Sequence, residues 1–203
     1  MLQILDGKTA EETVRVRPLR RREYEHLERG GAFEDGPVEL LCGAMVEVVA
    51  DCPGHDPVVG VAAARLRARG GAACEVRVKQ PLPLTDFTVA RPDLVVGPVT
   101  TPWASGRPAT WLVVEVADAS LPKDRGLKRV LYAQAGIEEY WVVDLAAGVV
   151  EAFARANARL GEWEAYAVST VGEWVVHGSR PTLALSVDDL MAGLWPGGAA
   201  LAG

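Results

Sequence analysis

Two apolar, β-branched segments each carry one carboxylate where a buried strand is expected. Residues 92–96 read PDLVV and residues 111–116 read WLVVEV. Segments of this composition form strands that are covered on both faces of a sheet. An ionised carboxylate in such a strand costs several kcal/mol unless a partner compensates its charge. Asp93 and Glu115 would also repel each other if their strands are neighbours.

A cation must therefore lie close to both carboxylates. A shared metal ion is one solution, and a set of oxygen ligands suits Mg²⁺ or Mn²⁺. Lys128 is a second cation, because it lies on a predicted helix over 124–134, beside an apolar stripe that faces the sheet. The alternative is that the carboxylates form structural salt bridges with basic residues of the chain, for which the candidates are Arg91, Lys79 and Lys128.

Length and composition are consistent with one α/β domain that buries a sizeable core, since the chain has 203 residues and is 49% hydrophobic. The formal charge of -6 does not exclude nucleic acid, because a nuclease needs only a local basic groove. The three cysteines lack metal-type spacing and are expected to be reduced thiols. We find no signal peptide and no apolar stretch of roughly 18 residues that could span a membrane, so a cytoplasmic location is expected.

Periodicity and turn residues predict alternating strands and helices. The expected helices cover residues 20–29, 57–69, 124–134 and 188–194. The expected strands cover residues 38–41, 44–49, 73–80, 87–96, 111–116, 138–143 and 149–153, and the first two form a hairpin joined at Cys42 and Gly43. Residues 97–108 are expected to form a loop, and residues 183–187 lead into the last helix. Residues 163–168 and 173–176 are expected to pair as an added antiparallel hairpin. A period of two in residues 87–96 would place Arg91 beside Asp93, and Asp124 is a plausible N-cap of its helix. Tyr132, Tyr140 and Trp141 are expected to pack in the core.

Domain boundaries follow from composition. Residues 1–19 are polar and mixed, and we expect an N-terminal arm. Residues 20–195 are expected to form a single domain, because no repeat or linker divides them. Residues 196–203 are rich in glycine and alanine and are expected to form a flexible tail.

Four motifs occur in an order that resembles a known family. They are RPDL at 91–94, LVVEV at 112–116, DRGLK at 124–128 followed by Tyr132, and GIEEYWVVD at 136–144. This set is similar to the Uma-type restriction endonuclease family of the PD-(D/E)XK nuclease superfamily, and the resemblance covers roughly residues 20–155. It implies a restriction-endonuclease-like α/β fold, with a central mixed sheet flanked by helices and with the added C-terminal β-hairpin.

The resemblance also implies an activity, which is metal-dependent hydrolysis of phosphodiester bonds in DNA. Asp93, Glu115 and the carbonyl of Val116 would bind Mg²⁺ or Mn²⁺. Lys128 would orient or deprotonate the attacking water and stabilise charge on phosphorus. Glu39, the first glutamate of a family motif, would be a further catalytic residue that binds a second metal or holds a water.

Two more residues complete the expected site: Gln80 at a strand end and Arg91 would help hold the substrate phosphate. A homodimer is expected because many nucleases cut two strands.

Departures from the family pattern leave two other classes open. Cys42, Ala44, Asp118 and Ala119 differ from the residues usual in the family, and Ala117 stands where the parent superfamily has its lysine. The chain could therefore be an inactive nuclease-fold module for binding or assembly. It could also be a metal-dependent hydrolase of RNA or nucleotides.

Overall fold

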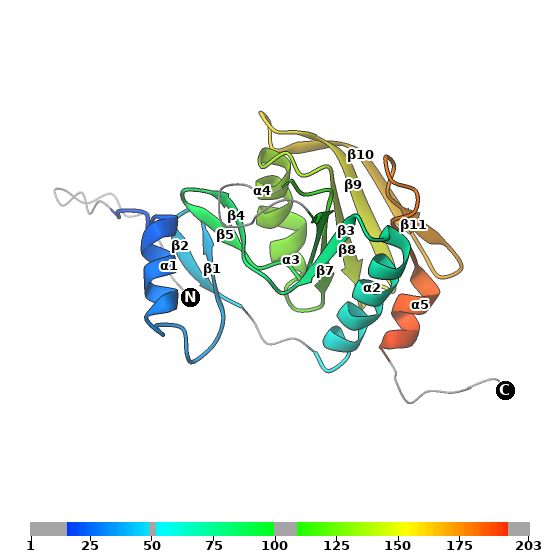
Figure 1. Ribbon diagram of the computed structural model, residues 1–203, viewed down its shortest axis with the longest axis horizontal. Coiled ribbons are helices and arrows are strands. Elements are labelled where there is room, and N and C mark those ends of the chain that lie inside the picture. Colours follow the sequence, from blue (N-terminus) through cyan, green and yellow to red (C-terminus); the bar gives the residue numbers. More distant parts are fainter. Residues whose placement is uncertain (1–15, 49–51, 100–108, 195–203) are drawn as a thin grey trace, which may run out of the picture.

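The structure is a computed structural model that describes residues 16–48, 52–99 and 109–194. The greater part of the predicted arm over 1–19, most of the predicted loop before residue 109, and the predicted tail over 196–203 lie outside these residues. The described strands form a six-stranded sheet, a four-stranded sheet and a two-stranded sheet (Figure 1).

The six-stranded sheet is the centre of the domain. Its strand order is β10-β9-β8-β7-β6-β3. The strands are β3 (Cys74–Val78), β6 (Leu94–Pro98), β7 (Leu112–Ala117), β8 (Glu139–Asp144), β9 (Val149–Asn157) and β10 (Glu162–Ser169). Strands β7 and β8 run parallel and the other neighbours run antiparallel, which confirms the predicted mixed sheet. Every residue of β7 and β8 is buried, as expected for strands covered on both faces.

Helices cover the two faces of this sheet (Figure 1). On one face, α2 (His55–Gly70) and α5 (Val187–Gly193) share an apolar core with side chains from β6, β7 and β8. The pair β11 (Trp174–Val176) and β12 (Ala184–Ser186) adds to the same core. On the opposite face, α4 (Arg129–Gln134) packs against a second core that contains Val113, Tyr140 and Val142. The expected flanking helices are therefore present.

The connection from β7 to β8 is one helical segment with a wide turn in its middle. It consists of α3 (Leu121–Lys123), a π-helical turn η2 (Asp124–Lys128) and α4. The backbone N–H of Arg129 donates to the carbonyl of Asp124, the five-residue spacing that defines a π turn. The segment begins at Leu121 after Ser120, so the prediction that Asp124 caps the helix is wrong. Such turns often occur at functional sites.

The four-stranded sheet lies beside the main one. Its order is β2-β1-β5-β4, with β1 (Val38–Leu41), β2 (Ala44–Glu47), β4 (Leu82–Thr85) and β5 (Thr88–Ala90). Helix α1 (Arg21–Arg29) packs on it through Tyr24. The predicted hairpin of β1 and β2 is confirmed, and its turn residues Cys42 and Gly43 both have positive φ, 52° and 82°. Two positive φ values are typical of a type I′ turn.

Two local predictions are wrong. Residues 87–96 do not form one strand. Arg91, Pro92 and Asp93 separate β5 from β6, and these two strands belong to different sheets. Proline has no N–H for a sheet ladder, which favours an interruption at this point. The extra C-terminal strand pair is present, but its partners differ: β10 pairs with β9, and β11 pairs with β12.

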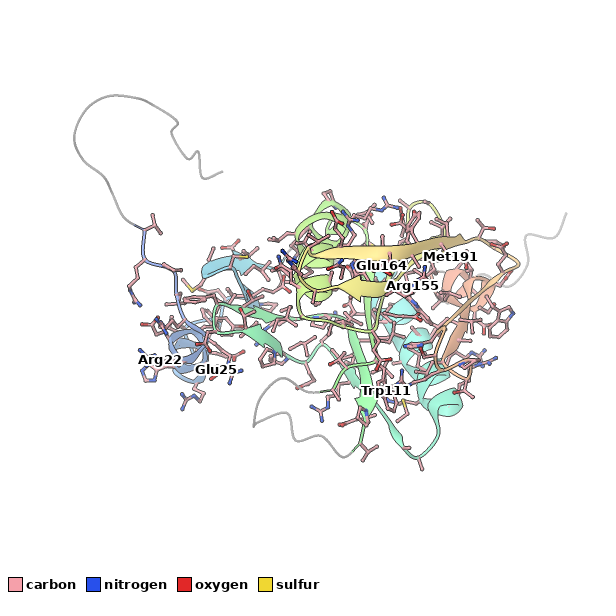
Figure 2. All side chains as sticks on the ribbon, turned by 90° about the horizontal axis from the view of Figure 1, so that it is seen from above. Arg22, Glu25, Trp111, Arg155, Glu164 and Met191 are labelled. Carbon is pink, nitrogen blue, oxygen red and sulfur yellow. The ribbon has the colours of Figure 1, made fainter. Side chains whose placement is uncertain are left out.

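The four-stranded sheet and the six-stranded sheet lie one after the other along the long axis of the molecule (Figure 1). Figure 2 shows Arg22 and Glu25 of α1 at one end and Met191 of α5 toward the other. Among the described residues, no helix is long and apolar enough to cross a membrane. The three cysteines are free thiols.

Candidate active site

A cavity of about 420 Å³ lies where the two sheets meet. The first residue of α2, the strand break before β6, the end of β7 and the segment α3–η2 all contribute to it. The lining residues include Asp35, Val48, His55, Lys79, Arg91, Asp93, Glu115, Val116, Ser120, Lys123, Asp124 and Lys128. The structure thus brings Asp93, Glu115, Lys128 and the backbone of Val116 into one cavity, as the motifs predict.

Asp93 is buried and held by two donors. Its Oδ2 accepts a 2.8 Å hydrogen bond from the backbone N–H of Val116, and it lies 3.2 Å from Nε2 of His55. Its Oδ1 receives no hydrogen bond from a described residue. The N–H and C=O of one strand residue point the same way, so the carbonyl of Val116 also faces the side on which Asp93 lies. Asp93 and Val116 both line the cavity.

Glu115 points from β7 to the face of the sheet that η2 and α4 cover. Its Oε1 accepts hydrogen bonds from Nζ of Lys128 at 2.8 Å and from the hydroxyl of Tyr132 at 2.7 Å. Burial raises the pKa of Glu115 to about 8, and the nearby carboxylates of Asp124 and Asp93 add to this rise although Lys128 opposes it. Without a bound cation, Glu115 is therefore mostly protonated at neutral pH.

Lys128 lies among three carboxylates. Its Nζ is 2.9 Å from Oε1 of Glu39, 2.8 Å from Oε1 of Glu115 and 3.6 Å from Oδ1 of Asp124. Burial favours the neutral amine, but these carboxylates outweigh it and raise the pKa of Lys128 well above its ordinary value. Lys128 therefore remains an ammonium ion at neutral pH.

Glu39 comes from β1 of the small sheet, and it is fully buried. Its Oε2 accepts from Nζ of Lys123 at 2.7 Å, and its Oε1 accepts from the backbone N–H of Arg91 at 2.8 Å. Burial disfavours its charge, yet Lys128, Lys123 and this backbone N–H together lower the pKa of Glu39 below 4.5. Glu39 therefore carries a negative charge and connects the small sheet to the helical segment.

Asp124 is a buried carboxylate without hydrogen bonds. It is 1% exposed and lines the cavity, and neither carboxylate oxygen has a hydrogen-bond partner among the described residues. Burial raises the pKa of Asp124, and the charge of Lys128 only partly offsets this effect. A buried polar group left unpaired costs about 1–3 kcal/mol, so this carboxylate is suited to a donor or cation that enters the cavity.

The residues expected to hold phosphate lie in different places. Arg91 lines the cavity, but its guanidinium group pairs with Glu28 and donates to the hydroxyl of Tyr24 and the carbonyl of Val38. Residues 91–93 lie between β5 and β6 and belong to no strand, so the predicted shared strand face of Arg91 and Asp93 is wrong. Gln80 is exposed after β3 and is absent from the cavity lining.

Sequence reasoning missed several side chains of the site. His55 fits a surface or capping histidine, yet it is buried against Asp93. Tyr132 does pack in the core, but its hydroxyl also contacts Glu115. Lys123 and Asp124 contribute a cation and a carboxylate from the same helical segment as Lys128. Their positions five and four residues before Lys128 were the available signal.

The donor set fits a hard divalent cation that keeps part of its water shell. Among the described residues, no three His, Cys, Asp or Glu side chains are placed together as a metal site. Asp93 and Glu115 each have one oxygen without a hydrogen bond from the described residues, and the carbonyl of Val116 would be a third oxygen donor. Mg²⁺ is commonly bound in this way, through one or two carboxylates with water and substrate phosphate.

A comparison with solved structures finds the same fold. The crystal structure of "a putative nuclease belonging to DUF820" from Anabaena variabilis superimposes with a TM-score of 0.69. The alignment has 15% sequence identity and covers 87% of this chain and 99% of that chain. This similarity shows that the two proteins share a mixed α/β fold. A search of curated proteins found no match.

A comparison with protein families matches residues 21–188 to Uma2, which is described as "Putative restriction endonuclease". The match includes all four motifs on which the resemblance was based and extends beyond them in both directions. Since it spans most of the chain, the protein belongs to the Uma2 family.

Proposed function

We propose that this protein is a metal-dependent nuclease that hydrolyses phosphodiester bonds in DNA. The convergence of Asp93, Glu115 and Lys128 on one cavity carries the proposal, because the three come from separate segments of the sequence. The buried carboxylate of Asp124, to which no described residue donates a hydrogen bond, lies in the same cavity and supports the proposal. A network that served only to stabilise the fold would gain from satisfying that group.

Asp93, Glu115 and the carbonyl of Val116 would hold Mg²⁺ or Mn²⁺. When bound, the ion would supply Lewis-acid polarisation of the phosphoryl group and activation of water. The N–H of Val116 and His55 hold Asp93 in place, and Tyr132 holds Glu115. These contacts fix the positions of both carboxylates before substrate binds.

Lys128 would stabilise the negative charge that develops on the phosphoryl oxygens. Its raised pKa favours this electrostatic role over the removal of a proton from water. Glu39 keeps the ammonium group in position from the other sheet. Lys123 lies at the edge of the cavity, where the substrate phosphate would approach.

Calorimetric titration with Mg²⁺ and Mn²⁺ tests the metal site. We expect the wild-type protein to bind and Asp93→Asn to lose binding by at least tenfold. Asp118→Asn is the matched control, because Asp118 is an exposed carboxylate just after β7 and is absent from the cavity lining. Absence of binding in the wild type would overturn the proposal.

A plasmid-nicking assay with the tighter metal tests the activity. We expect Lys128→Met to lower the rate by about 10²–10³-fold, the usual effect of removing one group that stabilises transition-state charge. Single-stranded RNA and nucleotides are tested as parallel substrates. If the protein hydrolyses one of these and not DNA, the proposed substrate is wrong.

An inactive binding or assembly module is the second candidate, because the 2.8 Å ion pair between Lys128 and Glu115 could instead be a structural salt bridge that takes the place of a metal ion. In that case no divalent cation would bind to the wild-type protein, and no substrate would be cleaved.

A further inference from the structure

A second pocket of about 310 Å³ lies between the helical segment and the hairpin of β9 and β10. Its lining consists of Arg125, Arg129, Glu151, Phe153, Trp163 and Tyr166, which we call the arginine–aromatic pocket. Figure 1 shows α4 alongside β9 and β10, and contacts between these elements agree. This pocket shares no lining residue with the cavity of Asp93 and Glu115.

Aromatic rings form one wall of the pocket. The ring of Phe153 lies 5.0 Å from that of Tyr166 and 6.4 Å from that of Trp163, measured between centroids. Tyr166 is 56% exposed although it is a large aromatic residue on a strand. The indole N–H of Trp163 donates to the carbonyl of Arg129 at 2.9 Å, which fixes the ring. The wall therefore offers a rigid and accessible aromatic surface.

The two arginines of the pocket have different partners. Arg125 donates to Asp144 at 2.8 Å and to Glu151 at 2.5 Å, so its charge is compensated. Arg129 donates through Nε to the carbonyl of Arg125, and its guanidinium carbon lies 5.7 Å from the ring centroid of Phe153. No described carboxylate lies within ion-pair distance of Arg129. Arg129 is therefore the cation of this pocket that remains for an anion from outside.

The carboxylate of Glu151, like that of Asp144, pairs with Arg125 and not with Arg129. Its Oε2 accepts from Arg125 and its Oε1 accepts from the hydroxyl of Tyr166 at 2.5 Å. Both oxygens are thus used to hold the pocket together. The lining as a whole carries two guanidinium groups and one carboxylate, beside an exposed aromatic ring.

We propose that the arginine–aromatic pocket binds one unpaired nucleotide of a single-stranded nucleic acid, with its phosphate on Arg129 and its base against Tyr166. Aromatic rings beside arginine are the usual means of holding unstacked bases, whereas a base inside a duplex cannot reach such a ring. This proposal rests on the proposed function, because it assumes that the nucleic acid bound in the pocket continues to the cavity of Asp93 and Glu115. Asp124 and Lys128 reach the cavity from the same π turn and helix that carry Arg125 and Arg129.

Binding of fluorescein-labelled dT12 and rU12, measured by fluorescence anisotropy in EDTA, tests the pocket without cleavage. We expect Tyr166→Ala to weaken binding by about 5- to 100-fold, the usual effect of losing one stacked base, and Tyr166→Phe to keep it. Arg129→Gln should weaken binding and should lower the slope of log K against log salt by about one, the effect of losing one phosphate contact. Arg129→Lys should keep much of the affinity. Tighter binding of dT12 or of rU12 identifies the strand as DNA or RNA.

Arg155→Gln is the matched control, because Arg155 is an exposed arginine of β9 outside the pocket and pairs with Glu164 (Figure 2). It should bind like the wild type. The proposal is overturned if the wild type does not bind, if a dA12·dT12 duplex binds as tightly, or if Tyr166→Ala and Tyr166→Phe, each confirmed as folded by circular dichroism, bind alike. Binding that persists in a protein without nicking activity would defeat the proposed function and leave the pocket intact.

Discussion

Lys128 is a buried cation whose partners come from three elements. Glu39 lies on β1, Glu115 on β7, and Asp124 in the same π turn. Removing this cation leaves the charged carboxylate of Glu39 with one compensating cation fewer and removes the ammonium donor of Glu115 from a site of low polarity. The contacts that would position Lys128 for its proposed role therefore also contribute to the stability of the fold.

Lys128→Met should lower the free energy of unfolding by about 3–5 kcal/mol at neutral pH in EDTA, the usual cost of removing one partner from a buried ion pair. Urea denaturation followed by circular dichroism measures this loss. Arg155→Met is the control, since Arg155 and Glu164 form an exposed pair that contributes less than about 1 kcal/mol. Equal losses in the two variants would contradict the buried network.

The pKa of Glu115 predicts a pH dependence of stability in the metal-free protein. Its folded-state pKa of about 8 lies above the ordinary value of 4.5, so the folded protein retains a proton that the unfolded chain releases. The contribution of Glu115 is therefore present below about pH 4.5 and is lost as the pH rises toward 8.

Glu115→Gln should flatten this dependence by up to about 1.4 kcal/mol per pH unit. Denaturation in EDTA at a series of pH values measures it, with the exposed Glu164→Gln as control. An unchanged slope in Glu115→Gln would mean that Glu115 ionises normally.

The elements that the sequence predicted well are those with strong local signals. Uniform apolar runs identify β7 and β8, and the Cys42–Gly43 turn identifies the hairpin of β1 and β2. The strand break at Pro92 and the partners of β10 depend on contacts between distant segments. A period of two cannot indicate where one strand leaves one sheet and enters another.

The candidate site was likewise predictable where the signal is local and not where it depends on tertiary contacts. The motifs identified the carboxylates of Asp93 and Glu115 and the ammonium of Lys128, which do meet in one cavity. The burial of His55 and the unpaired oxygens of Asp124 arise from tertiary packing. No local pattern distinguishes a buried histidine at a helix start from an exposed one.

Glycines in two elements should respond in opposite ways to substitution by alanine. Gly126 lies in the π turn, and an added Cβ would have no atom within 4 Å, so Gly126→Ala should raise stability by about 0.5–1 kcal/mol. Gly43 has a φ of 82°, and its Cβ would lie 2.3 Å from Cβ of Pro18, so Gly43→Ala should destabilise by more than that amount. Thermal denaturation measures both, and a stabilised Gly43→Ala would contradict the turn geometry.

At the scale of the whole molecule, the cavity lies between two sheets that have separate cores. Glu115 of the main sheet lines the cavity, and Glu39 of the small sheet contacts Lys128, which also lines it. A ligand that bridges the cavity should therefore stabilise the docking of the sheets as well as the site itself. The expected homodimer and the expected cytoplasmic location stay predictions.

Saturating Mn²⁺ should raise the stability of the wild-type protein by about 2.7 kcal/mol at a concentration one hundred times Kd. Thermal denaturation with increasing Mn²⁺ measures the shift, and Asp93→Asn should show little of it. Sedimentation velocity on the same samples determines whether the protein is a dimer. A shift of equal size in Asp93→Asn would place the ion elsewhere.

The hydrogen bond between Lys123 and Glu39 joins residues 84 positions apart in the chain. Contacts of such long range form late in folding, because closing the intervening chain costs entropy before the contact is gained. An intermediate with only the main sheet formed would contain Glu115 and Lys128 but would lack the carboxylate of Glu39. The proposed nuclease activity should therefore return after most of the secondary structure during refolding, because the site is complete only when both sheets have assembled.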